Sequence, residues 1–271
     1  MKTSSQKSVP LTVTFFNFLG KSIIDLVNNL GAVAVFFSKS LVMIFRPKQL
    51  PEIIEQVYHI GARSSAIVML VGLFTGMVVA LQLYYVFAKL GSEGLLGSVV
   101  AVALVRELGP VLAAIMITAR SGSSMAAEIA TLRISEQVDA LYTMGIDPIG
   151  YLISPRIAAS IISFPVLTAF FDLIGILGGY FAGVVLLGAD PGTYFSRVQS
   201  SLEFVDVRDG FIKTFVFAVI VSTICCFQGY FTHMRSESHG AKAVGSSTTS
   251  AVVLSCVMIL IADYVVVSFL I

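Results

Sequence analysis

The residues with the strongest chemical signal are an adjacent arginine and glutamate, Arg106 and Glu107, within a long apolar stretch of the chain. An ionised side chain at the centre of a bilayer costs about 2.5–3.5 kcal/mol on insertion scales, so such residues mark substrate or ion pathways inside the protein. Adjacent residues on a helix point about 100° apart and cannot pair face to face, as residues four apart can. Each side chain therefore needs its own partner or a hydrated cavity.

The next two residues, Gly109 and Pro110, predict a kink in the same helix. Proline has no backbone N–H, so the carbonyl of residue 106 loses its helical donor, and the proline ring bends the helix. Charges beside an unpaired carbonyl are tolerated in a membrane only where protein or water replaces lipid. The sequence therefore favours a cavity-lining site, and the alternative is a structural kink whose charges satisfy one another.

Other polar residues in apolar stretches carry weaker signals. Asp172 and Asp263 could relay protons, although a hydrogen bond to Ser, Thr or Tyr on a neighbouring helix is the favoured explanation. The group Gln82, Tyr84 and Tyr85 fits either the mouth of a cavity or an interfacial belt of aromatic side chains. Glycines at a four-residue interval predict faces where helices pack closely: Gly72, Gly76, Gly175, Gly179 and Gly183.

The chain lacks the motifs of an enzyme. Gly20-Lys21-Ser22 resembles the end of a phosphate-binding loop, but Phe15 stands where that motif requires glycine. The sequence contains no cluster of metal ligands, and its three cysteines lie in apolar runs. The net charge of +1 argues against nucleic acid as a partner. We therefore expect no catalytic residue, no metal and no bound cofactor, and any ATP hydrolysis must come from another subunit.

Composition places these residues in membrane helices. Of 271 residues, 56% are hydrophobic and 12% are charged, whereas soluble domains average about 45–50% and 25%. A membrane helix needs about 20 mostly apolar residues. Five stretches qualify, so we predict an all-α membrane protein with spans at residues 64–88, 94–119, 157–189, 214–232 and 243–271.

Residues 1–50 are apolar too, but charges divide them. The longest uncharged stretch, residues 26–38, has 13 residues, and such a helix reaches about 20 Å against the roughly 30 Å of a hydrocarbon core. We predict a cytoplasmic, interfacial amphipathic helix in residues 1–50, followed by a membrane domain in residues 51–271. A signal peptide is the less favoured alternative, because polar residues interrupt the apolar run.

The basic residues predict the orientation. Of the seventeen Lys and Arg residues, twelve fall on one side: seven within residues 1–63, three within 120–156 and two within 233–242. Because Lys and Arg accumulate on the cytoplasmic side of membrane proteins, we expect a cytoplasmic N-terminus and a C-terminus on the opposite side.

The loop at residues 120–156 is too polar to cross a membrane, and its pattern predicts an amphipathic helix from Glu128 to Met144. Gly145, with Asp147-Pro148 beyond it, predicts where this helix ends. Such a helix could dock into a groove of a partner or lie on the membrane surface. Its members include Glu128, Leu132, Arg133, Glu136, Asp139, Leu141 and Met144.

The most distinctive segment is residues 104–156, LVRELGPVLAAIMITARSGSSMAAEIATLRISEQVDALYTMGIDPIGYLISPR. It resembles the MlaE family of ABC-transporter permeases, the membrane subunits of Mla/Mce-type lipid transport systems. Residues 165–179 and the closing LIADYVVVSFL also resemble the family, whereas residues 1–49 match it only in character. The resemblance thus covers the chain from residue 50 to its end.

The resemblance implies a homodimer of permeases that moves phospholipid between the inner membrane of a Gram-negative cell and a periplasmic MCE-domain protein, and so contributes to outer-membrane lipid asymmetry. It implies two ABC ATPase subunits, which hold the ATP and Mg, and a STAS-domain protein as an optional partner. Arg106 would offer its charge to the lipid phosphate. The implied lipid-cavity residues are Arg106, Glu107, Leu108, Gln82, Tyr85, Val78 and Leu81, and the implied ATPase-coupling residues are those of the Glu128 to Met144 segment.

Three other functions fit part of the pattern. An ion-coupled secondary transporter or channel could use Arg106, Glu107 and Asp172, but the chain shows no internal inverted repeat. An assembly scaffold of the cell envelope would not need Arg106 for transport. A permease of the Mce type could instead take up sterol or another lipid.

Overall fold

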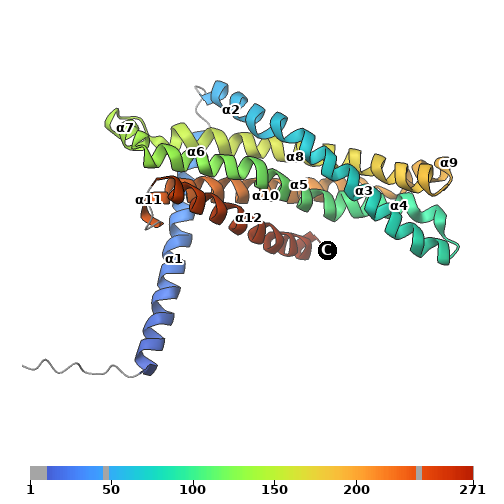
Figure 1. Cartoon of the computed structure of the whole chain (residues 1–271), viewed down its shortest axis with the longest axis horizontal. Helices are drawn as coiled ribbons and strands as arrows, with labels where there is room; N and C mark the ends of the chain where they lie inside the picture. The colour runs from blue at the N-terminus through green and yellow to red at the C-terminus, as the bar shows by residue number, and fades with distance from the viewer. Residues whose placement is uncertain (1–10, 45–48, 236–239, 271) are drawn as a thin grey trace, which may run out of the picture.

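The computed structural model describes residues 11–44, 49–235 and 240–270, and in these ranges the chain forms helices and no strand. The all-α prediction is confirmed. Five helical segments of the described chain are long and apolar enough to cross a membrane: Leu50–Lys89, Glu93–Ile134, Ile149–Leu186, Phe204–Tyr230 and Ala241–Leu270. They lie side by side along one direction in Figure 1.

Shorter elements make up these segments and join them. The first contains α2 (Leu50–Val57), η2 (Tyr58–Ala62) and α3 (Arg63–Lys89), and the second contains η3 (Glu93–Leu95), α4 (Leu96–Ala103), η4 (Leu104–Leu108), α5 (Gly109–Ile117), η5 (Thr118–Gly122) and α6 (Ser123–Ile134). After α7 (Gln137–Thr143) come η6 (Ile149–Ile153), α8 (Ser154–Tyr180), η7 (Phe181–Leu186), α9 (Pro191–Ser201), α10 (Phe204–Tyr230), α11 (Thr232–Arg235) and α12 (Ala241–Leu270). Figure 1 places α7 and α9 at opposite ends of the bundle, which we call the α7 end and the α9 end.

The helices extend beyond the uncharged stretches. A helix continues past a charge wherever its side chain finds a partner or water, because backbone hydrogen bonds do not depend on side-chain charge. The second segment therefore runs from Glu93 to Ile134, and Arg106 is nearer to its start than to its end. The charge pair therefore lies off the middle of this segment, on the side of the α9 end.

The prediction of one helix from Glu128 to Met144 is wrong. The first part belongs to α6, which ends at Ile134, and the chain reverses through Glu136, whose φ of 60° is left-handed. A residue in this conformation cannot continue a right-handed helix, so α7 starts afresh at Gln137. The predicted stop is confirmed, since α7 ends at Thr143 and Gly145 has a φ of +76°.

The glycines at four-residue intervals join α3 to α8 within the chain. A Cβ on Gly76 would overlap the backbone of Gly175, and one on Gly72 would come within 2.7 Å of the carbonyl oxygen of Phe171. Only glycine permits so close an approach of two backbones. This packing explains why α3 lies along α8 in Figure 1.

The N-terminal helix α1 (Leu11–Ile44) runs across the direction of the bundle in Figure 1, as a helix in the membrane interface would. Its apolar part, Gly31–Ile44, is shorter than a membrane span. Phe36 is buried against Phe227 and Tyr230 of α10, and the backbone oxygen of Ser40 accepts a hydrogen bond from Ser154. These contacts hold α1 on the bundle at its α7 end.

Candidate functional site

A lysine that the sequence does not single out organises the charged residues of the second span. Lys213 lies on α10 with its side chain 3% exposed, and its Nζ is 2.6 Å from Glu107 Oε2 and 3.3 Å from Asp263 Oδ1. Nζ also donates a hydrogen bond to the carbonyl oxygen of Arg106 at 2.8 Å. This is the carbonyl whose helical donor Pro110 removes. The Lys213 ammonium thus donates hydrogen bonds to this carbonyl and to Glu107 and forms an ion pair with Asp263.

Arg106 has a separate partner. Its Nε lies 3.3 Å from Asp206 Oδ1, while its side chain remains 49% exposed. Asp209, which lines the same hollow as Arg106, pairs with Arg208 at 2.9 Å. Three cations and four carboxylates thus meet here, with a formal net charge of −1: Arg106, Arg208 and Lys213 with Glu107, Asp206, Asp209 and Asp263. We call these seven residues the charged cluster.

A hollow of about 340 Å³ opens beside the charged cluster, between α4, η4, α10 and α12. Its lining combines charged groups with apolar walls: Arg106, Glu107, Asp209 and Lys213 with Val102, Ala103, Val267 and Leu270. A volume near the lower limit of the roughly 300–1,000 Å³ of small-molecule pockets holds only part of a lipid. The geometry suits a molecule with a charged group and an apolar tail.

The remaining predicted cavity residues lie elsewhere in the single chain. On α3, Val78, Gln82 and Tyr85 are exposed, with Val78 at 49% and Tyr85 at 65%. Both Leu81 and Leu108 are partly buried against the core. Within the described chain the hollow thus brings together Arg106 and Glu107 and leaves the α3 residues on an outer face.

The two intramembrane carboxylates differ in their surroundings. Asp263 belongs to the charged cluster, whereas Asp172 on α8 lies against Gly109, where an added Cβ would overlap its Oδ1. That oxygen has no hydrogen-bond partner in the described part of the chain. The glycine beside Pro110 therefore leaves space for a buried carboxylate.

Sequence reasoning missed Lys213, Asp206 and Asp209 because it assigned them to the loop before the predicted span 214–232. Helix α10 instead starts at Phe204, where Glu203 and Asp206 form a capping box. Two signals were available: the capping pattern, and the spacing of residues 206, 209 and 213, which puts all three on one helix face.

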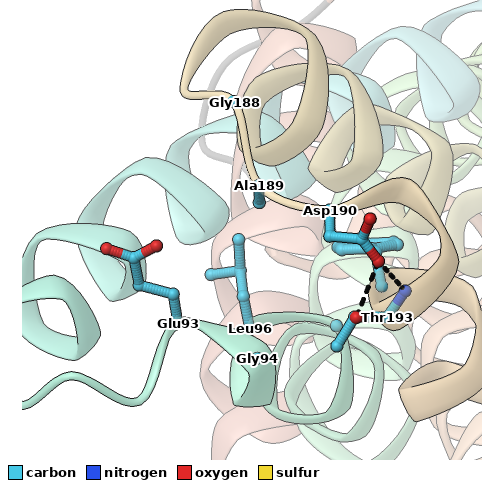
Figure 2. A pocket seen from close by; sticks show the side chains of 9 residues that line it. Glu93, Gly94, Leu96, Gly188, Ala189, Asp190 and Thr193 are labelled. Carbon is cyan, nitrogen blue, oxygen red and sulfur yellow. Dashed lines mark hydrogen bonds between the residues drawn. The ribbon is translucent and has the colours of Figure 1, made fainter.

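A smaller hollow of about 210 Å³ at the α9 end is built around a helix cap (Figure 2). Asp190 accepts hydrogen bonds from the backbone N–H and the hydroxyl of Thr193, both at 2.7 Å. These bonds lower the pKa of the Asp190 carboxyl below its ordinary value. Glu93 stands on the opposite side, with Leu96 between them. The Asp190 carboxylate is thus used to start α9.

The predicted coupling residues form a hairpin at the α7 end. Arg133 of α6 donates to Asp139 of α7 at 2.7 Å and to Nδ1 of His233 at 3.0 Å, and its guanidinium lies 5.6 Å from the ring centroid of Tyr230. Tyr142 adds a hydroxyl–hydroxyl contact of 2.8 Å to Tyr230. We call the group Arg133, Asp139 and His233 the hairpin clamp. Burial lowers the pKa of the His233 imidazole, and the nearby Arg133 lowers it further. Both effects favour the neutral ring, which can accept a hydrogen bond from Arg133.

The other residues of the hairpin divide into anchored and free ones. Glu128 is anchored by Arg156 Nη2 at 3.1 Å, and Leu132 packs against the core at this end. Leu141 is partly buried, whereas Glu136 and Met144 are exposed. The hairpin therefore presents its tip outward while its base is held by α8, α10 and α11.

Comparison with known proteins identifies what kind of membrane protein carries this cluster and this hairpin. The sequence profile of the family described as permease MlaE matches residues 53–269. The chain belongs to the MlaE permease family. The matched residues include all the spans that contribute to the charged cluster and the whole α6–α7 hairpin.

Curated relatives of this MlaE-family chain match nearly its full length. A probable ABC transporter permease protein of Rickettsia felis is 43% identical over 251 residues, covering 92% of this chain and 95% of the relative. The intermembrane phospholipid transport system permease protein MlaE of Haemophilus influenzae is 38% identical over 259 residues, covering 94% and 97%. A chloroplastic protein of Arabidopsis thaliana, TRIGALACTOSYLDIACYLGLYCEROL 1, is 38% identical over 80% of this chain and 60% of its own length.

Proposed function

We propose that this chain is the membrane subunit of an ATP-driven transporter that moves phospholipid across or out of a Gram-negative inner membrane. The Haemophilus relative is named as the permease protein of an intermembrane phospholipid transport system, and the Rickettsia relative is named as a probable ABC transporter permease. The observation that carries the proposal is the half-exposed Arg106 guanidinium at the edge of an otherwise largely apolar hollow. A phospholipid has the matching chemistry, an anionic phosphate next to long apolar chains.

In this mechanism the lipid phosphate replaces Asp206 as the partner of Arg106. The exchange is feasible because Arg106 is about half exposed and its bond to Asp206 is a single contact at 3.3 Å. Lys213 does not take part, because its ammonium is buried and holds Glu107, Asp263 and the freed carbonyl of residue 106. It keeps the charged cluster in place while Arg106 changes partner.

A second copy of the chain completes the cavity. The hollow of one chain is too small for a whole lipid, and Gln82 gives the exposed face of α3 a polar group that lipid tails cannot satisfy. In a homodimer Val78, Gln82 and Tyr85 would join Arg106 and Glu107 around one enlarged cavity. The α9 end would face a periplasmic MCE-domain protein, which receives or delivers the lipid.

The α6–α7 hairpin meets the ATPase in this arrangement, which places the α7 end and the N-terminus in the cytoplasm. ATP and Mg bind to the partner ATPase, and a STAS-domain protein could join that subunit. When the two ATPase subunits close, they push on the exposed tip around Glu136. The hairpin clamp and the Glu128–Arg156 bridge pass this movement to α8 and α10.

Photocrosslinking from the proposed cavity tests lipid binding. A photoreactive residue placed at position 85 or 106 of the full transporter should capture phospholipid above the level seen at position 166, an exposed apolar site on α8. Labelling at or below the level of position 166 would rule out this cavity. Transport driven by an ion gradient in liposomes without an ATPase would favour the ion-coupled alternative.

A charge reversal tests the ATPase contact. Glu136 is exposed and makes no ion pair within the described residues, so Glu136→Lys changes the tip of the hairpin and leaves the hairpin clamp intact. The ATPase should co-purify poorly with this variant, and normally with Glu93→Lys at the α9 end. Wild-type amounts of ATPase on Glu136→Lys would count against the hairpin as the coupling element.

A further inference from the structure

A third hollow, of about 240 Å³, lies toward the α7 end between the first two membrane segments, away from the charged cluster. Gln56, His59 and Arg63 line it from one segment, and Arg120, Ser121 and Glu128 from the other. Arg63 and Arg120 stand where the two uncharged stretches, residues 64–88 and 94–119, meet polar sequence. The hollow is therefore at the level where a membrane core gives way to lipid head groups.

Both walls of the hollow contain a π-helical turn, η2 on one side and η5 on the other. Such turns are rare and occur often at functional sites. A buried hydrogen bond of 2.7 Å between Ser64 Oγ and Ser121 Oγ ties the walls together, and Ser121 Oγ also contacts the backbone oxygen of Ile60 at 3.3 Å. The hollow is thus pre-formed and held at a fixed width.

The guanidinium of Arg120 is only loosely held. Its hydrogen bonds to other described residues use Nη1 alone and are long, 3.5 Å to the backbone oxygen of His59 and 3.4 Å to Ser64 Oγ. Because a guanidinium carries five N–H donors in one plane, its Nε and Nη2 are left to bind a ligand. Arg63 adds a second guanidinium at the rim, 5.8 Å from the ring centroid of Tyr58.

The one carboxylate among the residues that line this hollow, Glu128, is already engaged. Glu128 accepts from Ser124 Oγ at 2.8 Å through Oε1 and from Arg156 Nη2 at 3.1 Å through Oε2. Arg156 approaches from α8 with its side chain 9% exposed, so this pair is locally neutral. Glu55 lies outside this lining, 3.9 Å from His59, with its side chain 70% exposed to solvent. Arg63 and Arg120 therefore form no ion pair with a described residue.

We propose that this hollow binds a phosphate group between Arg63 and Arg120. Two arginines offer planar forks of donors that match phosphate oxygens. The group could come from an anionic lipid head group or from free phosphate, which share this chemistry. Ile54, Tyr58 and Ile67, on the same helical segment as Arg63, are exposed at 68%, 58% and 40% and would offer apolar contacts to an acyl chain. The inference does not depend on the transport function proposed above.

Native mass spectrometry of the full chain in detergent, titrated with phosphatidylglycerol, tests the proposal. Arg120→Gln and Arg63→Gln should each weaken binding about tenfold, which corresponds to about 1.4 kcal/mol. Arg197→Gln on α9, at the opposite end, is the matched control and should bind as the wild type does. Because Arg63 is exposed at the rim, its variant keeps the test valid even if Arg120→Gln folds poorly.

A parallel titration with inorganic phosphate, followed by phosphorus NMR, separates the two sources. Arginine-dependent binding of phosphatidylglycerol assigns the site to a lipid head group, and arginine-dependent binding of phosphate alone assigns it to a soluble anion; both support the site. Affinities that do not change in Arg63→Gln and Arg120→Gln would overturn the proposal. So would an equal loss in Arg197→Gln, because binding would then reflect overall charge.

Discussion

Replacing Lys213 by methionine tests the central feature of the charged cluster. Methionine fills a similar volume but leaves Glu107, Asp263 and the carbonyl of residue 106 without their shared cation. Breaking a fully buried ion pair costs about 3–5 kcal/mol. Glu107 is 49% exposed and can turn toward water in the hollow, which reduces its contribution to this free-energy cost. We therefore expect a loss of roughly 3 kcal/mol, equivalent to roughly 6–12 °C in the unfolding temperature.

A companion variant separates charge from packing. Adding Glu107→Gln and Asp263→Asn to Lys213→Met removes the uncompensated carboxylates, so this triple variant should unfold at a higher temperature than Lys213→Met alone. Lys242→Met, which changes an exposed lysine at the start of α12, is the matched control. Thermal unfolding in detergent measures all of them. A Lys213→Met variant as stable as Lys242→Met, or a triple variant no more stable than the single one, would refute the reasoning.

Two further predictions concern packing and pH. Gly76→Leu should separate α3 from α8 and destabilise the protein by about 1–3 kcal/mol. Gly245→Ala, inside α12 with open space around it, should not lower the unfolding temperature. Equal losses in the two variants would contradict the packing role. The hairpin clamp should be complete above the ordinary pKa of His233, 6.5, and be lost as the pH falls below it, because the folded state lowers that pKa and protonation would oppose Arg133. Hydrogen exchange of α7 measures this, and a pH response that persists in His233→Gln would exclude His233 as its cause.

The membrane helices were predictable because each is specified by its own residues. Long apolar stretches must be helical in a bilayer, since each backbone group has to find its partner within the segment. The predicted number of spans and the all-α fold are confirmed, and the bounds differ where helices continue past charges. The exception is the hairpin, where apolar spacing runs on through Glu136 although the backbone reverses there. A pattern of side chains does not reveal one left-handed residue.

The candidate site was only half predictable. Arg106 and Glu107 were conspicuous because an apolar stretch makes any charge visible, and the unpaired carbonyl of residue 106 followed from Pro110. The partners of Arg106 and Glu107 were not predictable in the same way, because Lys213 was assigned to the polar loop before the span 214–232. The same limit applies to Val78, Gln82 and Tyr85, whose relation to Arg106 depends on how chains assemble.

By itself the sequence determined which segments enter the membrane and which span carries unsatisfied charge, because both depend on residues that are neighbours along the chain. Only the tertiary structure decided how that charge is balanced. Lys213 lies 106 residues from Glu107, and it reaches both Glu107 and Asp263 because α10 packs between the second and fifth spans. Helix packing therefore brings Lys213 to these carboxylates. The pattern of charge and hydrophobicity along the chain does not reveal a contact between residues so far apart in the sequence.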